Sequence, residues 1–104
     1  MDFVNNIPVR ELAPGFTAQV VHGASTSVSF VRAKQGHRVP LHHHVHEQVT
    51  HIVEGTLEME IGGQQYTLTA GSIFVIPSDT PHNAYAVTDC YIIDFFSPAR
   101  DDLR

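Results

Sequence analysis

Apolar and polar residues alternate with a period of two along several short segments of this chain. The clearest case is the segment 56–61, in which Leu57, Met59 and Ile61 are separated by two glutamates. Because successive side chains of a β-strand point to opposite faces, the apolar residues are predicted to share a buried face and the glutamates an exposed one. A Gly-Gly pair follows at 62–63, and glycine suits the positive φ angles of a two-residue hairpin.

Turn residues recur every eight to twelve residues along the chain, whereas helical periodicity is nearly absent. This cadence is typical of a β-sandwich or barrel, so we expect an all-β fold. The segments predicted to form strands are 9–12, 16–22, 27–34, 48–54, 56–61, 64–69, 72–76, 82–87 and 91–95. The segment 36–40, which contains a glycine and a proline, is interpreted as a turn, and the tail 97–104 as coil or a short helical turn.

Length and composition indicate one globular domain spanning residues 1–104. Apolar residues make up 42% of the chain and charged residues 16%, which is typical of a folded chain rather than a disordered one. The formal net charge is -5, and neither Lys nor Arg is clustered. Nucleic acid and anionic membrane surfaces are therefore not expected partners.

The lack of a recognisable targeting signal and the single cysteine favour a cytoplasmic protein. No apolar run approaches the roughly 18 residues of a membrane span, and residues 1–20 lack the pattern of a secretory signal. Cys90 is the single cysteine, which excludes an intrachain disulfide and suits a reducing compartment. Its apolar neighbours predict a strand, so a buried, inert thiol is expected rather than a reactive one.

Histidines are concentrated in one short segment. Four of the eight histidines fall within five positions, and these are His42, His43, His44 and His46. If the stretch is extended, His42, His44, His46 and Gln48 point to one face. His82 follows an apolar strand and a proline-stiffened turn further along the chain. Imidazoles gathered in this way predict a transition-metal site for Zn, Cu, Fe or Ni, and oxygen ligands nearby extend the choice to Mn.

The histidine run has two other interpretations. An expression tag lies at a terminus and is usually uninterrupted, whereas this run lies in the middle of the chain, so the tag interpretation is rejected. The run could also be a solvated polar loop that binds metal only opportunistically. The presence of His82 in the second half of the chain favours the metal site over the loop.

The spacing of these residues closely resembles the two motifs of the cupin superfamily. The first motif is matched over 36–55 by Gly36, His42, His44, Gln48 and Gly55. The second is matched over 71–86 by Gly71, Pro77, Pro81 and His82. The resemblance implies a jelly-roll β-barrel in which two strands bring the metal ligands together in the interior. The ligands that it implies are His42, His44, Gln48 and His82, while His43, His46 and His51 are left out because the family uses no ligand there.

The chain departs from the cupin pattern at three positions. Most cupins have glutamate where Gln48 stands, and the neighbouring Glu47 has the opposite strand parity and cannot easily substitute. Three neutral imidazoles and a neutral amide would leave a divalent cation with its full charge, which favours an anionic ligand. Asp79 stands where glycine is common and Ala86 where asparagine is common, and these two differences concern local turn geometry.

The segment 94–102 resembles the end of the small cupins of pectin and alginate degradation, which linearise unsaturated monouronates. The resemblance implies that Asp94 serves as acid or base, that Phe96 packs on the sugar and that Arg100 pairs with the uronate carboxylate. Asp94 and Phe96 share a strand parity, as these roles require. The alternative is a purely structural set, with Asp94 ending a strand, Phe96 in the core and Arg100 on the surface.

The function expected from these features is a metal-dependent lyase or isomerase acting on a small anionic sugar acid. Mn, Fe, Co, Ni and Zn all remain possible metals. Two other classes stay open, an Fe(II)-dependent dioxygenase and a non-catalytic small-molecule-binding cupin. A homodimer is expected, because the apolar segment of Phe3, Val4 and Ile7 has little to cover it within so small a barrel.

Overall fold

The computed structural model describes residues 3–104, and this part of the chain is almost entirely β-structure, as predicted. In chain order the elements are the 3₁₀ helix η1 (Val4–Asn6), the strands β1 (Arg10–Ala13), β2 (Phe16–His22), β3 (Ser27–Ala33), β4 (Arg38–His42), β5 (Glu47–Glu54), β6 (Thr56–Ile61), β7 (Gln64–Thr69), β8 (Ile73–Ile76), β9 (His82–Ala86) and β10 (Cys90–Ser97), and the 3₁₀ helix η2 (Asp101–Leu103). The short helix η2 lies in the tail, where coil or a helical turn was expected.

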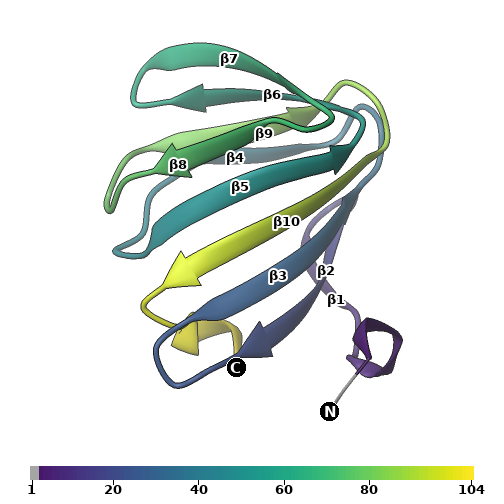
Figure 1. The fold of residues 1–104 in the computed structure, drawn as a ribbon. Coiled ribbons are helices and arrows are strands. Elements are labelled where there is room, and N and C mark those ends of the chain that lie inside the picture. Colours follow the sequence, from purple (N-terminus) through teal and green to yellow (C-terminus); the bar gives the residue numbers. More distant parts are fainter. Residues whose placement is uncertain (1–2) are drawn as a thin grey trace.

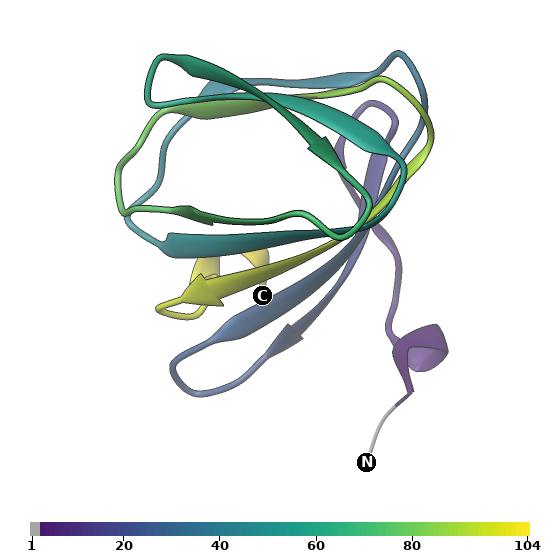
Figure 2. The same cartoon turned by 45° about the horizontal axis from the view of Figure 1, so that its top comes forward.

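The strands form two antiparallel sheets that face each other (Figures 1 and 2). The larger sheet has the strand order β1-β2-β3-β10-β5-β8 and the smaller one β4-β9-β6-β7. The hairpin between β6 and β7 has the predicted turn, since Gly62 and Gly63 both have positive φ and Ile61 pairs with Gln64. Most predicted strand ends agree with the structure within one or two residues, which is the usual uncertainty of strand boundaries.

One strand was missed by the sequence analysis. The segment 36–40 was interpreted as a turn, but Arg38–His42 forms β4, the edge strand of the smaller sheet. Pro40 interrupts the sequence signal, yet an edge strand accepts proline because one side of its backbone needs no ladder partner. β4 ends at His42 and β5 begins at Glu47, so the stretch from 42 to 48 is not one continuous strand. The prediction that one extended strand points the side chains of His42, His44, His46 and Gln48 to the same face is therefore wrong.

Strand β10 lies between β3 and β5, and its register arranges the inner face of the larger sheet in rows (Figure 1). Residues directly opposite each other in antiparallel strands share a face, so each residue of β10 forms a row with one residue from each neighbour. Three successive rows, written β3–β10–β5, are Ser27–Phe96–Gln48, Ser29–Asp94–Thr50 and Val31–Ile92–Ile52. The interior thus changes along β10 from polar rows to a fully apolar one.

The apolar end of the interior is the hydrophobic core. Its members come from both sheets, among them Ile52 and Ile76 from the larger sheet and Leu57 and Met59 from the smaller one, all at most 4% exposed. Cys90 is buried against this core, and burial raises the pKa of its thiol, in agreement with the expected inert cysteine. Within residues 3–104 there is no helix long and apolar enough to cross a membrane.

Candidate metal and substrate site

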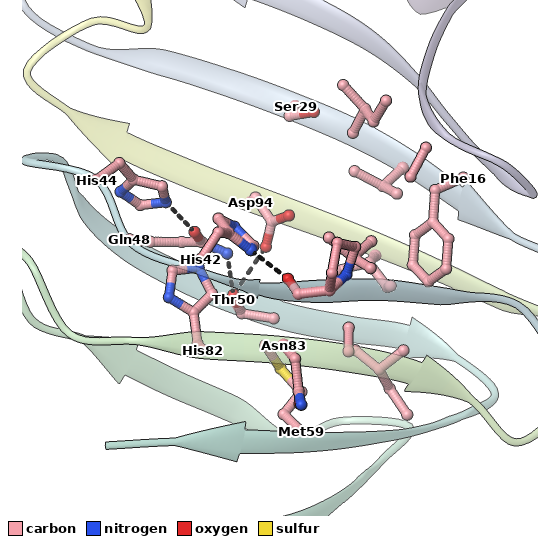
Figure 3. Close-up of a pocket in the computed structure, with 18 of the residues that line it drawn as sticks. Phe16, Ser29, His42, His44, Gln48, Thr50, Met59, His82, Asn83 and Asp94 are labelled. Carbon is pink, nitrogen blue, oxygen red and sulfur yellow. Dashed lines mark hydrogen bonds between the residues drawn. The ribbon is translucent and has the colours of Figure 1, made fainter. Parts of the chain in front are cut away.

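Three of the four predicted metal ligands are histidines that converge at one end of the interior (Figure 3). His42 ends β4, His82 begins β9, and the two residues pair across the smaller sheet. His44 lies in the connection from β4 to β5. The potential ligand atoms of the three residues lie within 4.8 Å of one another, and the ring centroids of His42 and His82 are 4.3 Å apart. This cluster could hold a metal ion.

Backbone carbonyls fix the orientation of all three imidazoles. In each ring the Nδ1 atom lies within hydrogen-bond distance of a carbonyl oxygen, which can only accept a hydrogen bond. The partners are Pro40 at 2.8 Å from His42, His46 at 3.0 Å from His44 and Thr80 at 2.8 Å from His82. The proton of the neutral ring therefore sits on Nδ1, and Nε2 keeps its lone pair for a metal. Such backbone partners are typical of metal-ligating histidines.

The protonation of these rings also suits metal binding. Burial lowers the pKa of His82 from 6.5 to about 4, with neighbouring histidines and Arg100 adding to the effect. Burial likewise lowers the pKa of His44, again helped by Arg100. Both imidazoles are therefore uncharged at neutral pH, which is the form that coordinates metal.

Gln48, the fourth predicted ligand, points its amide oxygen toward the histidines. Its side chain is 6% exposed, and Oε1 lies 3.2 Å from Nε2 of His44. The orientation of the amide follows from a relay of hydrogen bonds (Figure 3). Thr50 Oγ1 donates its one proton to Asp94 Oδ1 at 2.8 Å, so it can only accept from Gln48 Nε2, 2.9 Å away. The amide nitrogen is thereby committed to Thr50, and the oxygen faces the imidazoles.

The donor set fits a first-row divalent cation. The contact between Gln48 Oε1 and His44 Nε2 brings together two atoms that both carry lone pairs and no proton. Two acceptors placed side by side repel each other unless a cation lies between them. Three imidazole nitrogens and one amide oxygen are a set that Mn, Fe, Co, Ni and Zn can all use.

Asp94 faces the interior next to this cluster and does not end a strand, because β10 continues to Ser97. Burial raises the pKa of its carboxyl group from 3.8 to about 6. The hydrogen bonds from Thr50 and Gln48 and the charge of Arg100 act in the opposite direction and lower the pKa, but burial is the larger effect. The pKa of Asp94 is thus shifted toward neutral pH, as is common for residues that act as acid or base in active sites.

Phe96 and Arg100 lie together beside the cluster. Phe96 is 6% exposed and packs edge-on against His44, with ring centroids 5.9 Å apart. The guanidinium carbon of Arg100 lies 4.6 Å from the centre of the Phe96 ring. Arg100 also donates from Nε and Nη2 to the two carboxylate oxygens of Asp102, at 3.0 and 2.8 Å. Only 15% of the Arg100 side chain is exposed, so it is not the surface residue of the structural alternative.

One cavity of about 520 Å³ joins these residues, which is within the range of small-molecule sites. Its polar lining consists of His42, His44, Gln48, Thr50, His82, Asn83, Asp94, Arg100 and Ser29. The rest of its wall is mainly apolar and includes Phe16, Val31, Leu57 and Ile92. All seven residues predicted as metal ligands or catalytic groups therefore line the same cavity.

The histidines that were left out of the ligand set are not part of the cluster of His42, His44 and His82. His43 is exposed, and its Nδ1 atom lies 3.9 Å from a carboxylate oxygen of Asp79. His51 is on the opposite face of β5 from Thr50, and its Nδ1 lies 3.2 Å from the carbonyl of Ser72. His46 is partly buried near Phe96, with ring centroids 6.3 Å apart. Asp79 has a φ of 59°, the left-handed conformation that explains why glycine is common at this turn position.

Thr50 and Asp102 are parts of this arrangement that the sequence analysis missed. Thr50 follows Gln48 by two residues, so strand parity alone could have placed it on the same inner face. Asp102 lies two residues beyond Arg100 in the tail, where no strand or helix periodicity indicates which side chains meet. The Arg100–Asp102 pair therefore has no signal in the sequence beyond opposite charge.

Comparison with known proteins identifies the fold class. The model of the Cupin domain family matches residues 29–96, and the chain belongs to this family. A crystal structure of an RmlC-like cupin from Shewanella frigidimarina NCIMB 400 superposes with a TM-score of 0.92 at 29% identity, covering 99% of this chain and 94% of the other. The predicted jelly-roll cupin barrel is thereby confirmed.

Two further similar proteins are both named KdgF. The structure of KdgF from Halomonas sp. has a TM-score of 0.90 and 30% identity, covering 98% of this chain and 96% of that one. The pectin degradation protein KdgF of Dickeya dadantii (strain 3937) is 25% identical over 100 residues, which is 91% of this chain and 89% of the relative. The resemblance to pectin-degradation cupins drawn from the sequence is confirmed.

Metal binding is predicted to depend on the inward-facing histidines. We expect His44→Ala and His82→Ala to lose the ion, whereas His43→Ala and His51→Ala keep it, because only the first two present a free Nε2 to the cluster. The measurement is elemental analysis after loading with Ni²⁺ and exhaustive buffer exchange. Full occupancy in His82→Ala would show that the ligand set is wrong.

The relay through Thr50 is predicted to tune metal affinity. Thr50→Val keeps the shape of the side chain but removes the hydroxyl that commits the Gln48 amide nitrogen. We expect the Ni²⁺ dissociation constant to rise by about tenfold or more, as is typical when a hydrogen-bond partner of a ligand is lost. Thr67→Val, at an exposed position of β7, is the matched control and should leave the constant unchanged. Equal affinity in Thr50→Val and wild type would contradict the relay.

Proposed function

We propose that this cupin is a metal-dependent enzyme of pectin or alginate catabolism that opens the ring of an unsaturated monouronate to its linear keto form. The observation that carries the proposal is the convergence of three kinds of group in one cavity, namely a neutral metal-ligand set, a buried carboxyl group and an arginine. The similarity to two proteins named KdgF supports the same class of substrate.

The ligand set and the arginine make the cavity suited to an anion. No carboxylate belongs to the set of His42, His44, Gln48 and His82, so a bound divalent cation would keep its full charge and would stabilise a developing oxyanion. Arg100 adds a permanent positive charge on the wall of the same cavity. A small sugar acid offers both a carboxylate and hydroxyl oxygens to such a site.

Asp94 is proposed to move the proton in the reaction. Ring opening requires that the hemiacetal hydroxyl lose its proton while the bond from its carbon to the ring oxygen breaks, which leaves an aldehyde and an enolate. Protonation of the enolate on carbon then gives the ketone. A single carboxyl group that takes the first proton and later returns one to carbon serves both steps, and a positioned acid or base contributes about a hundredfold or more.

Arg100 is proposed to bind the uronate carboxylate through the end of its guanidinium that faces away from Asp102. The edge formed by Nε and Nη2 is occupied by Asp102, so the expected pairing with substrate cannot use that edge while Asp102 stays in place. Nη1 and the second hydrogen of Nη2 form another edge that can bind a carboxylate in two-point fashion. Asp102 and the Phe96 ring hold the guanidinium still, which reduces the entropy lost on binding.

Turnover and binding are expected to depend on different residues. Asp94→Asn keeps the shape of the side chain but cannot move a proton, so turnover should fall about a hundredfold or more with little change in KM. Arg100→Ala should mainly raise KM, because a charge-assisted pair is made in both ground and transition states and is worth about 1.5–3 kcal/mol. The assay follows the loss of ultraviolet absorbance of an unsaturated monouronate.

Arg104→Ala is the matched control for the arginine variant, since Arg104 pairs with Asp101 on the exposed tail outside the cavity. It should retain wild-type kinetics. A wild-type rate no higher than the spontaneous rate would refute the uronate function, and oxygen consumption or ligand-induced thermal stabilisation would then distinguish a dioxygenase from a binding protein. An unimpaired Asp94→Asn variant of an active wild type would refute only the assignment of Asp94.

We also infer that the protein is a homodimer, with a second copy covering the outer face of the larger sheet. Apolar side chains on this face remain exposed on three adjacent strands, with Ile73 at 66% and Val75 at 51% on β8, Val53 at 36% on β5 and Phe95 at 45% on β10. Val75 and Phe95 belong to one row across β8, β5 and β10, so the exposed groups are contiguous. Contiguous apolar patches of this kind mark protein–protein contacts. The N-terminal segment that first suggested a dimer also leaves Phe3 65% exposed.

Light scattering at micromolar concentration should give twice the 11.5 kDa mass of the chain. Val75→Lys should shift the mass to that of the single chain, because it places a charge within the exposed apolar patch, at the β8 end of the row. Gln65→Lys, an exposed substitution on β7 of the other sheet, should remain dimeric. A wild-type mass of 11.5 kDa would contradict the dimer.

A further inference from the structure

Ser29 is a buried hydroxyl that none of the roles above explains. It is 2% exposed, lies on β3 and lines the cavity (Figure 3). Within residues 3–104 its Oγ atom has no hydrogen-bond partner, which is true of only one other buried side-chain atom there, Nδ1 of His46. Buried polar groups are normally hydrogen-bonded, because an unpaired one has lost its interactions with water without replacement.

Ser29 differs from the neighbouring hydroxyl groups on the inner face of the larger sheet. Ser27, two residues earlier on the same face, is fully engaged, since its Oγ accepts from the backbone N–H of Arg100 at 2.8 Å and lies 2.8 Å from His22 Nδ1. Thr50, in the same row as Ser29, donates to Asp94 and accepts from Gln48. Ser29 alone among these inner-face hydroxyls keeps both its proton and its lone pairs free.

The register places Ser29 directly beside Asp94. The two residues are opposite each other on β3 and β10, so their Cβ atoms are about 4.5–5.5 Å apart and their side chains point into the same cavity. Thr50 occupies the other side of Asp94 and is already bonded to it. A ligand that reaches the Asp94 carboxyl group therefore passes next to a hydroxyl that can donate one hydrogen bond and accept others.

We propose that Ser29 is a substrate-binding residue that hydrogen-bonds a sugar hydroxyl adjacent to the group that Asp94 deprotonates. This assignment rests on the proposed function and refines it, because it requires a polyhydroxylated acid rather than a plain carboxylic acid. A cation held by the ligand set would attract negative charge, as Arg100 does, and any small carboxylate carries such a charge. Ser29 supplies the recognition of hydroxyl groups, since a ligand without one at this point leaves the serine unpaired.

The experiment compares Ser29→Ala with wild type in binding of two probes to the metal-loaded protein by calorimetry. D-galacturonate carries a carboxylate and ring hydroxyls, whereas tetrahydropyran-2-carboxylate keeps the ring and the carboxylate without hydroxyls. We expect the dissociation constant of galacturonate to rise about fivefold in Ser29→Ala, as loss of one neutral hydrogen bond implies. The constant of tetrahydropyran-2-carboxylate should be unchanged.

Thermal unfolding without ligand separates a binding role from a structural one. Removing an unpaired buried hydroxyl should leave the melting temperature of Ser29→Ala equal or higher, whereas Ser27→Ala, which loses made hydrogen bonds, should melt lower. Galacturonate that binds Ser29→Ala as tightly as wild type would refute the role of Ser29 and leave the uronate function intact. Failure of wild type both to bind galacturonate and to convert an unsaturated monouronate would refute the proposed function and the Ser29 assignment with it.

Discussion

The pairing of β10 between β3 and β5 is the constraint on which the site depends. It places Asp94 between Ser29 and Thr50 and places Phe96 between Ser27 and Gln48, all on the inner face of the larger sheet. Because side chains alternate along a strand, a slip of β10 by one residue would turn Asp94 and Phe96 to the outside and bring outward-facing residues of β10 inward. The apolar row of Val31, Ile92 and Ile52 opposes such a slip, since burial of these three side chains in the core stabilises only the observed register.

Hydrogen bonds of fixed direction link the strand register to the orientation of the metal ligands. The Asp94 carboxyl group accepts from Thr50, which leaves Thr50 able only to accept from the Gln48 amide. Backbone carbonyls play the same part for the three histidines by holding the proton on Nδ1. Lone pairs from two sheets and one connection are thus directed to one point, before any ligand enters. A preorganised set of this kind loses little free energy to rearrangement when it binds.

Much of this arrangement could be predicted from the sequence, because its signals are local. Alternation in β6, the Gly-Gly hairpin and the spacing of His42, His44, Gln48 and His82 are all readable over a few residues. The strand β4 was missed because Pro40 and the histidine run resemble a turn, and only pairing with β9 makes the segment extended. The roles of Ser29 and Asp102 depend on which side chains meet across the sheet or on the irregular tail. Such contacts have no short-range pattern, so they became visible only in three dimensions.

In the proposed reaction, a cation held by the three histidines and Gln48 enables ring opening at Asp94. The most direct test is to strip the protein of metal with a chelator, add Ni²⁺ back in steps and follow the ultraviolet absorbance of an unsaturated monouronate at each step. The stripped protein should match the spontaneous rate, and activity should rise in proportion to bound metal until one ion per chain is reached. Full activity in the stripped protein, or a metal-loaded protein no faster than the spontaneous reaction, would contradict the proposed reaction.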